Sequence, residues 1–340
     1  MIPAMENKND IAAIRETFSS AQMPANVRAA SQFGRKVFLR RFTHLALGSG
    51  FYSTEGSFVY RADGKNFTVK FDGRNLQFRA LYDAAYQHGY EIETGLLMRK
   101  LCRGSGAFWD VGANWGYFSL LAAAFPDFRG DIAAFEPNPN TFRDLTSTVE
   151  QAGMSGRIKL NNQGVGAEAC EMVVAESDRF NSGLSQLKKN GAGKKIPVVT
   201  LDSLGADKPL FIKIDAEGME LEIMRGAAQT MKQAKPFIVF ENFLEGDDIA
   251  KTCAPVEFLR AQDYRIFIPA LRFQVQGRAV AVSYGHDYNS FFAADPAPVL
   301  CLYELKDAER FLLGRQLNLL GVHAGRVEEM WAGGIQKMTV

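Results

Sequence analysis

An apolar run at 107–112, typical of a short buried strand, ends at one glycine, Gly112, and a second, Gly116, follows it. Glycines at this point let the backbone turn sharply and approach a ligand without a Cβ in the way. Asp110 lies at the end of the run, and Glu136 closes the next predicted strand. An acidic side chain at that second position can accept hydrogen bonds from both hydroxyls of a ribose. The spacing therefore predicts a nucleoside-binding site.

The glycine spacing also bears on which nucleoside is bound. A dinucleotide site would read GxGxxG, which places a pyrophosphate on a helix N-terminus. Here the pattern is DxGxNxG, so the carboxylate of Asp110 would repel a pyrophosphate. S-adenosylmethionine has a cationic amino-acid tail and no phosphate. The pattern therefore favours a methyl donor over NAD.

A second group of polar residues follows a later predicted strand, where Asp215 and Glu217 lie at a strand-to-helix turn. Paired carboxylates at such an edge bind a cation, share a proton or form a polar network. Glu241 and Asn242 end the next strand, so Asp215, Glu241 and Asn242 are candidate oxygen ligands for Mg²⁺. The alternative is that Glu217 and Glu220 only cap the helix N-terminus, where acids are favoured.

The elements that must position these residues alternate between strand and helix. Apolar patterns predict strands at 107–112, 131–136, 158–162, 210–215 and 236–242, with helices at 117–125, 139–152 and 219–234. This alternation predicts an α/β fold with a doubly wound, mostly parallel sheet.

The flanking segments differ in pattern from this core. Residues 1–50 are predicted to be helical, and Asp-Gly dipeptides between short β-rich runs at 58–78 indicate an antiparallel hairpin segment. We therefore expect three parts: an N-terminal helical and β-hairpin extension at 1–90, the nucleoside-binding domain at 91–292, and a C-terminal extension at 293–340.

The composition excludes several classes of protein. The chain has 340 residues, of which 47% are hydrophobic and 23% charged, and its net charge is +1 from 39 basic and 38 acidic residues. These values exclude a disordered chain, a collagen-like rod and a disulfide-dense mini-protein. A charge near zero also argues against nucleic acid as the partner. The four cysteines are far apart and predict neither a zinc site nor a disulfide framework: Cys102, Cys170, Cys253 and Cys301.

The hydropathy of the chain indicates where in the cell the protein is expected. No run approaches the roughly 18 apolar residues of a membrane span, and the first ten residues lack the apolar core of a signal peptide. We therefore expect a cytoplasmic protein. Residues 28–42 combine five basic residues with large apolar ones and no acid. This pattern is typical of an amphipathic helix in peripheral contact with an anionic membrane, or of the solvated face of an ordinary helix.

Several motifs occur together in an order that points to one family. They are DVGANWGYFSL from residue 110, FEPNP (135–139), SGLSQL (182–187), VVTLDSL (198–204), IKIDAEGMELEIMRGA (212–227) and IVFEN (238–242). As a set they resemble the FkbM family of S-adenosylmethionine-dependent methyltransferases. The resemblance runs from Glu91 to Asn242, with an echo at HDYNSFF (286–292), and it departs from the family pattern at Trp115 and Ala216.

The resemblance implies a Rossmann-like methyltransferase fold and O-methylation of a hydroxyl on a sugar, a glycan or a small metabolite. It also implies roles for residues on the donor side. Asp110, Gly112, Asn114 and Gly116 would hold the methionine part of the donor, and Glu136 its ribose. Asn138 and Gly164 would lie near the ribose or the adenine, and Asp215 would border the donor.

Methyl transfer from a sulfonium is an in-line displacement, so a nearby group must take the proton of the acceptor hydroxyl. Candidate bases are Asp215, Glu241 and His286, while Lys213 is expected to neutralise the carboxylates. Two other functions stay open: an NAD-dependent sugar-modifying oxidoreductase, and a non-catalytic scaffold that retains the fold.

Overall fold

The computed structural model describes residues 2–24, 53–174, 187–189, 191, 193–205, 208–244, 246, 248–283, 288–306, 310 and 313–338. Three features from the sequence lie outside these residues: the basic segment 28–42, His286 and most of the SGLSQL motif. The membrane-contact and His286 predictions therefore stay predictions.

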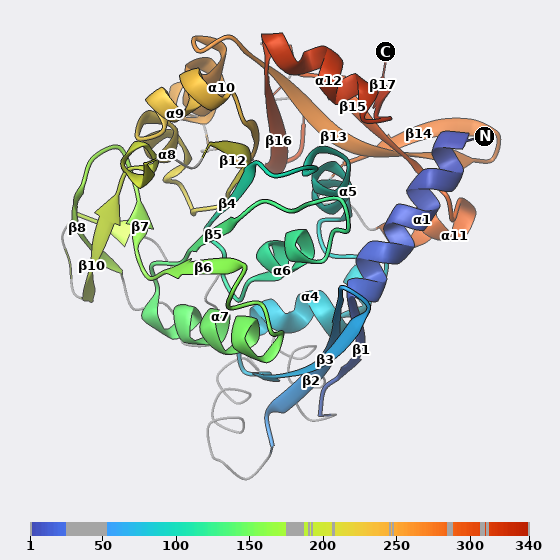
Figure 1. Cartoon of the computed structure of the whole chain (residues 1–340). Coiled ribbons are helices and arrows are strands. Elements are labelled where there is room, and N and C mark those ends of the chain that lie inside the picture. The colour runs from blue at the N-terminus through green and yellow to red at the C-terminus, as the bar shows by residue number, and fades with distance from the viewer. Residues whose placement is uncertain are drawn as a thin grey trace.

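A 10-stranded sheet forms the centre of the molecule (Figure 1). Across the sheet the strands follow the order β17-β15-β13-β16-β12-β11-β4-β5-β6, with β14 paired to β13. Their bounds are β4 (Ala107–Val111), β5 (Ile132–Phe135), β6 (Ile158–Asn161), β11 (Pro209–Ile214), β12 (Phe237–Phe243), β13 (Tyr264–Val275), β14 (Arg278–Val282), β15 (Val299–Glu304), β16 (Gln316–His323) and β17 (Gln336–Lys337).

Strands β12, β11, β4, β5 and β6 are parallel, and helices cover both of their faces. One face packs against α5 (Ile92–Leu101), α6 (Tyr117–Ala123) and α7 (Pro139–Gln151). The other packs against α8 (Glu220–Arg225), α9 (Ala228–Ala234) and α10 (Ile249–Arg260). Strands buried on both sides are continuous apolar runs, and all five residues of β4 are buried. The prediction of a doubly wound α/β fold is confirmed.

The order of the parallel strands locates the site. Strand β4 pairs with β5 on one side and with β11 on the other, so the direction of winding reverses between β4 and β11. In open α/β sheets, ligands bind beyond the carboxyl ends of the strands at such a reversal. The residues that follow β4, β5, β11 and β12 meet at this edge.

The expected boundary at residue 292 is wrong. Strand β16 lies between β12 and β13 and is antiparallel to both, and β15 extends the same sheet beyond β13. Residues 293–340 therefore complete the central sheet and are no separate extension. The apolar run of β16 is almost wholly buried, which is what holds the segment in the sheet.

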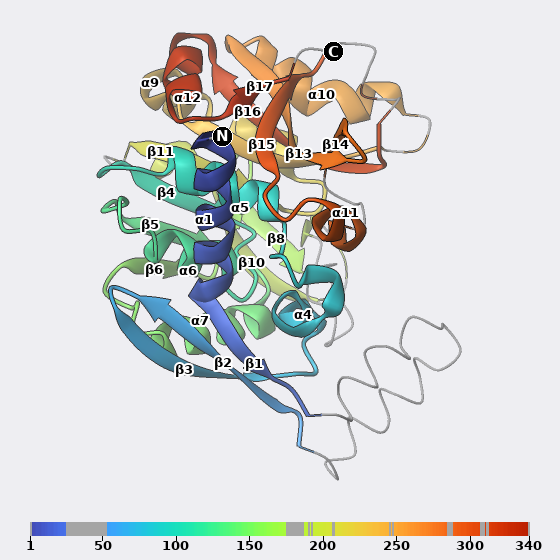
Figure 2. The same ribbon diagram turned by 90° about the vertical axis from the view of Figure 1, so that its right-hand side faces the viewer.

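The N-terminal part begins with α1 (Ile2–Thr17), which lies against α5 (Figure 2). Next come the strands of an antiparallel sheet: β1 (Phe18–Gln22), β2 (Glu55–Ala62) and β3 (Lys65–Asp72). Asp63 and Gly64 both have positive φ, so the predicted hairpin is confirmed. Residues 76–78 form a 3-10 helix in place of the expected strand and lead into α4 (Arg79–Tyr82).

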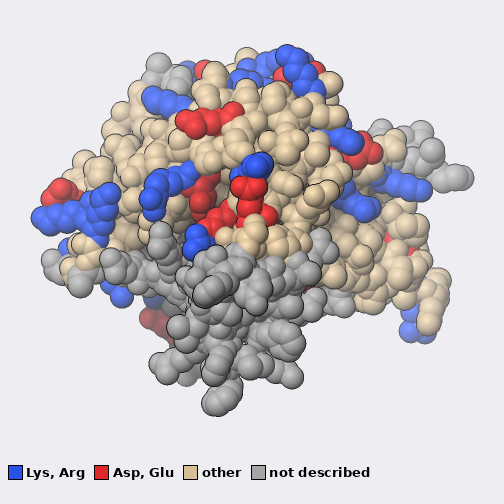
Figure 3. Space-filling view, turned by 90° about the horizontal axis from the view of Figure 1, so that it is seen from below, with Lys and Arg blue, Asp and Glu red and all other residues tan. Residues whose placement is uncertain are grey.

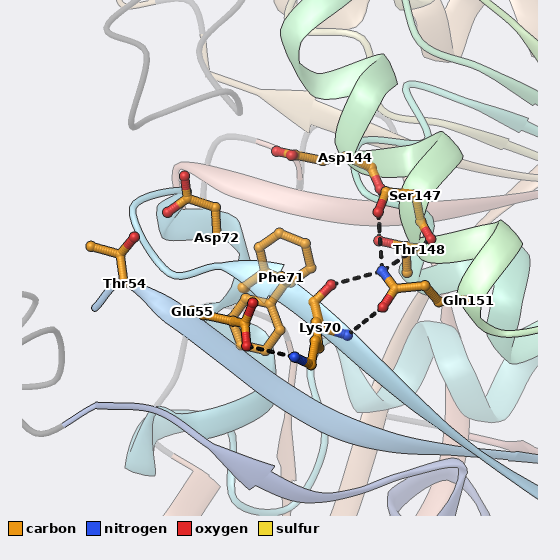
Figure 4. Close-up of a pocket in the computed structure, with 10 residues that line it drawn as sticks. Thr54, Glu55, Lys70, Phe71, Asp72, Asp144, Ser147, Thr148 and Gln151 are labelled. Carbon is orange, nitrogen blue, oxygen red and sulfur yellow. Dashed lines mark hydrogen bonds and ion pairs between the residues drawn. The ribbon is translucent and has the colours of Figure 1, made fainter. Parts of the chain in front are cut away.

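The side chain of Gln151 joins the N-terminal sheet to α7 (Figure 4). It accepts from the N–H of Lys70 and donates to the carbonyl of Lys70, both at 2.9 Å, as a neighbouring strand would. A cavity of about 360 Å³ lies beside this contact, between β3 and α7. The ion pair that lines this cavity, between Lys70 and Glu55, is exposed to solvent, so we do not propose the cavity as a ligand site.

A second small sheet packs beside the central one and consists of β7 (Gly164–Val165), β8 (Cys170–Val174), β9 (Leu187–Lys188) and β10 (Lys194–Val199). The described residues also form the helices α11 (Tyr288–Ala294) and α12 (Val327–Ala332). Within the described residues, no helix is long and apolar enough to span a membrane.

We predict that Phe78→Ala lowers the free energy of unfolding by about 3–4 kcal/mol. Phe78 is buried and stacks between Phe71, at 4.3 Å, and Trp115, at 4.8 Å between ring centroids. The substitution would open a cavity between the N-terminal sheet and the DxGxNxG loop. Urea unfolding measures the change, and Phe78→Leu, which keeps most of the volume, should lose less. An unchanged urea midpoint for Phe78→Ala would contradict this packing role.

Candidate functional site

The turn after β4 is built around Gly112. Its φ is +80°, and a Cβ at this position would lie 1.7 Å from the carbonyl oxygen of Asp215. Only glycine fits where the two strand ends approach so closely. The N–H groups of Gly112 and Ala113 both donate to the carbonyl of Phe135, each at 3.0 Å. The turn thus ties together the ends of β4, β5 and β11.

The rest of the turn adopts a left-handed conformation at two further residues. Asn114 has a φ of +52°, which asparagine tolerates better than most residues, and Gly116 has a φ of +95° at the start of α6. A Cβ on Gly116 would lie 2.8 Å from Leu145 of α7. Backbone conformation and close packing therefore both account for the glycines of the motif.

Glu136 is buried at the end of β5 and binds the turn directly. One carboxylate oxygen accepts from the N–H of Asn114 at 3.1 Å, and the other accepts from the N–H of Asn138 at 2.8 Å. Burial raises the pKa of Glu136 to about 7, although these two N–H donors act against the rise. Asn138 in turn caps α7, where its side chain accepts from the N–H of Asn140 at 2.9 Å.

Asn162 also belongs to this group, although the sequence analysis did not select it. Its amide donates to the carbonyl of Glu136 at 2.8 Å and to that of Pro137 at 3.2 Å. The sequence signal that could have identified Asn162 is its position directly after the third predicted strand, where polar residues reach the same edge of the sheet. Gly164 lies two residues later on β7, paired with Val198 of β10, and its role near the donor stays a prediction.

Asp110 is fully buried on β4. One carboxylate oxygen accepts from the hydroxyl of Ser119 at 2.6 Å, and burial raises the pKa of the group. Within the described part of the chain, its other oxygen, Oδ1, is buried without a hydrogen-bond partner. A buried acceptor of this kind is costly unless a ligand or water supplies a donor.

Lys213 and Asp215 form an ion pair at the end of β11. The Lys213 ammonium lies 2.9 Å from Asp215 Oδ2 and 4.7 Å from the centre of the Phe118 ring. Burial opposes its charge, but Asp215, Glu91 and Asp110 outweigh burial and raise the pKa of Lys213. Lys213 therefore stays charged and neutralises the carboxylates, in line with the role expected from sequence.

Glu91 is an acid of this site that the sequence analysis did not predict. It is buried at the start of α5 and accepts from the Asn318 amide at 2.9 Å. Burial raises its pKa to about 7 against the opposing effect of Lys213. In the sequence, Glu91 is simply an acid before a helix, and only the insertion of β16 brings Asn318 to it.

Three carboxylates lie together at the carboxyl ends of β11 and β12. Each of Asp215, Glu217 and Glu241 offers an oxygen, and these oxygens all lie within 4.8 Å of one another. Burial and then Asp215 raise the pKa of Glu241 to about 10, and the same causes raise that of Glu217 to about 7. Glu241 therefore holds a proton at neutral pH. Acidic side chains gather near the middle of the face seen in Figure 3.

Glu220 folds back onto its own loop, where its carboxylate accepts from the N–H groups of Ala216 at 3.2 Å and Gly218 at 3.1 Å. The capping interpretation therefore fits Glu220, whereas Glu217 lies with the carboxylates.

The prediction that Asn242 ligates a metal together with Glu241 is wrong. Successive residues of a strand point to opposite faces, so Asn242 lies on the other side of β12 from Glu241. Its amide donates to the carbonyl of Thr252 at 2.9 Å, and its oxygen accepts from Arg310. The amide nitrogen and the oxygen of Asn242 therefore both form structural hydrogen bonds on the face of β12 away from the carboxylates.

Comparison with known proteins accords with this arrangement. Residues 110–266 match the family described as the methyltransferase FkbM domain. The matched segment includes the turn after β4 and the carboxylates of Asp215 and Glu241. Over 137 residues it is 28% identical to the hexuronic acid methyltransferase AglP of Haloferax volcanii. The alignment covers 39% of this chain and 54% of AglP, so the chain spans about half the length of that relative.

Two solved structures are similar over part of the chain. A methyltransferase FkbM from Methylobacillus flagellatus is 18% identical, with a TM-score of 0.37, and the match covers 62% of this chain and 52% of that one. An O-methyltransferase from Bacillus cereus in complex with SAH is 12% identical, also with a TM-score of 0.37, over 68% and 79%. The fold assignment depends on the sheet topology given above.

We predict that Glu91→Gln reduces the pH dependence of stability. The variant keeps an acceptor for Asn318 but cannot titrate. In the wild type, a folded-state pKa of about 7 against the ordinary 4.5 means that the stability present below about pH 4.5 is lost as the pH rises to about 7. This difference corresponds to about 3 kcal/mol at roughly 1.4 kcal/mol per pKa unit.

Urea unfolding between pH 4.5 and 8 measures this effect. The free energy of unfolding of Glu91→Gln should fall less steeply than that of the wild type. Glu222→Gln, which changes an exposed acid on α8, serves as the control and should follow the wild type. Parallel curves for Glu91→Gln and the wild type would contradict the burial of a titrating carboxyl at this position.

Proposed function

We propose that this chain transfers the methyl group of S-adenosylmethionine to a hydroxyl of a sugar, a glycan or a small metabolite. The observation that carries the proposal is the placement of Glu136, buried beyond β5 and hydrogen-bonded to the turn of the DxGxNxG motif. This carboxylate lies at the reversal of the sheet, where a nucleoside is expected. Each of its oxygens has a further lone pair with which to accept a ribose hydroxyl.

The charges around the turn support a cationic donor. Asp110 offers a buried oxygen that lacks a partner among the described residues, beside the close backbone approach at Gly112. We assign the methionine part of the donor to Asp110, Gly112, Asn114 and Gly116. When bound, S-adenosylmethionine supplies an electrophilic methyl group on a sulfonium. A dinucleotide would place its pyrophosphate against the same carboxylates, which argues against the oxidoreductase alternative.

On the acceptor side, Asp215 and Glu217 are partly exposed, whereas Asp110 and Glu136 are buried. Lys213 pairs with Oδ2 of Asp215 at 2.9 Å, and the other oxygen of Asp215 can orient a hydroxyl that approaches the methyl carbon. Glu217 lies beside Asp215, and burial raises the pKa of Glu217 to about 7, so its carboxyl is partly protonated near neutral pH. Glu241 already holds a proton at that pH and acts as a base only after losing it. His286 stays a candidate.

A sugar acceptor is supported by the likeness to AglP, which is named for a hexuronic acid. The experiment is an incubation with methyl-labelled S-adenosylmethionine and a set of neutral sugars and hexuronic acids. Mass spectrometry and NMR of the product identify the methylated oxygen. We expect a methyl ether on a ring hydroxyl. A methyl ester on a carboxylate would contradict the assignment of a hydroxyl acceptor.

We predict that Glu136→Gln weakens S-adenosylmethionine binding by about 10-fold or more. The reason is the loss of charge-assisted hydrogen bonds to the ribose, each of which contributes roughly 1.5–3 kcal/mol. Titration calorimetry measures the dissociation constant, with Glu150→Gln, which changes an exposed acid on α7, as the control. Equal affinity in both variants would remove the ribose role of Glu136. Donor binding by the wild type without transfer to any acceptor would favour the scaffold alternative.

A further inference from the structure

We propose that Asp215, Glu217 and Glu241 form a binding site for a divalent cation such as Mg²⁺ or Mn²⁺. We further propose that the bound cation chelates two neighbouring oxygens of the acceptor. The second part rests on the proposed methyltransferase function, whereas the cation site itself does not.

The geometry of the three carboxylates is the first observation. Asp215 and Glu217 lie on the loop between β11 and α8, and Glu241 lies on the adjacent parallel strand β12. One oxygen from each lies within 4.8 Å of the others. Around an octahedral Mg²⁺ ion with the usual Mg–O distance of roughly 2.1 Å, adjacent oxygens are about 3.0 Å apart and opposite ones about 4.2 Å. Small side-chain rotations therefore bring all three onto one ion.

The second observation is an unsatisfied atom inside this group. Glu241 has only 6% of its surface exposed, and its Oε2 is buried without a hydrogen-bond partner among the described residues. Native proteins rarely leave a buried carboxylate oxygen without a donor or a cation. Three acids, Asp215, Glu91 and Glu217, act electrostatically on Glu241, and the Lys213 ammonium pairs with Asp215.

Neighbouring residues already hold two of the carboxylates in place. Lys213 binds Oδ2 of Asp215, and the Gln316 amide donates to Oε1 of Glu241. Each group therefore has one oxygen fixed by a donor and one left for an ion. Metal-binding carboxylates in proteins are commonly oriented by such hydrogen bonds to their outer oxygen. Gln316 lies on β16, so the strand that completes the sheet also orients this ligand.

A cation at this position has a consequence for the acceptor. Mg²⁺ usually binds only a few protein carboxylates and completes its coordination with water and substrate oxygens. A vicinal diol, or the hydroxyl and carboxylate of a hexuronic acid, offers two oxygens at a suitable spacing. Without the ion, an anionic sugar would face the carboxylates of Asp215 and Glu217 directly and be repelled. We therefore infer that a hexuronic acid binds only when the ion is present.

The test of the cation site is a titration of the full chain with Mn²⁺, followed by electron paramagnetic resonance of the free ion and by calorimetry. We expect one ion per chain. Glu217→Gln and Glu241→Gln should each weaken Mn²⁺ binding by about 10-fold or more, while Glu222→Gln, an exposed acid on α8, should bind as the wild type does. Circular dichroism and thermal unfolding confirm that each variant is folded. No saturable binding by the wild type, or equal binding by Glu217→Gln, would overturn the site.

The test of acceptor chelation uses glucuronic acid as the probe. Saturation-transfer NMR should detect its binding with Mg²⁺ present, and the signal should disappear in EDTA and in Glu217→Gln. Binding that is the same in EDTA would overturn the chelation. S-adenosylmethionine affinity is measured on the same samples. Binding of S-adenosylmethionine without binding of Mn²⁺ would refute the cation site and leave the methyltransferase proposal intact. Binding of Mn²⁺ without binding of S-adenosylmethionine would refute only the methyltransferase proposal.

Discussion

The ion pair between Lys213 and Asp215 is the interaction on which the rest of the site depends. Lys213 is buried at the end of a central strand, and its charge is maintained by Asp215, Glu91 and Asp110. It anchors Asp215 beside the turn at Gly112, where the two strand ends nearly touch. Because acids outnumber this cation, the edge of the sheet retains negative charge. A positively charged ligand is the partner that such an edge accommodates best.

Much of the donor side could be predicted from the sequence because it depends on local patterns. The glycines of the turn need positive φ and close packing, and these are requirements that residue type reveals directly. Glu136 could be located because an acid at the end of the second strand comes next to the first turn whenever the strands are parallel neighbours. The alternation of strands and helices likewise determined the doubly wound fold.

The remainder depends on contacts between distant parts of the chain. Strand alternation turns Asn242 away from Glu241, although the two are adjacent in sequence. The insertion of β16 brings Asn318 to Glu91 and Gln316 to Glu241 across more than 70 residues of sequence. The apolar run that becomes β16 gave no indication of its place in the sheet. These tertiary contacts remove Asn242 from the candidate metal ligands, and the oxygens that lie together are those of Asp215, Glu217 and Glu241.

We propose that the carboxyl edge of this sheet binds a cationic nucleoside donor. Titration calorimetry of the full chain with S-adenosylmethionine and with NAD, in parallel, measures this preference. We expect saturable binding of S-adenosylmethionine at one site per chain and no measurable binding of NAD. Binding of NAD alone would contradict it, because the pyrophosphate would then be tolerated beside Asp110 and Asp215.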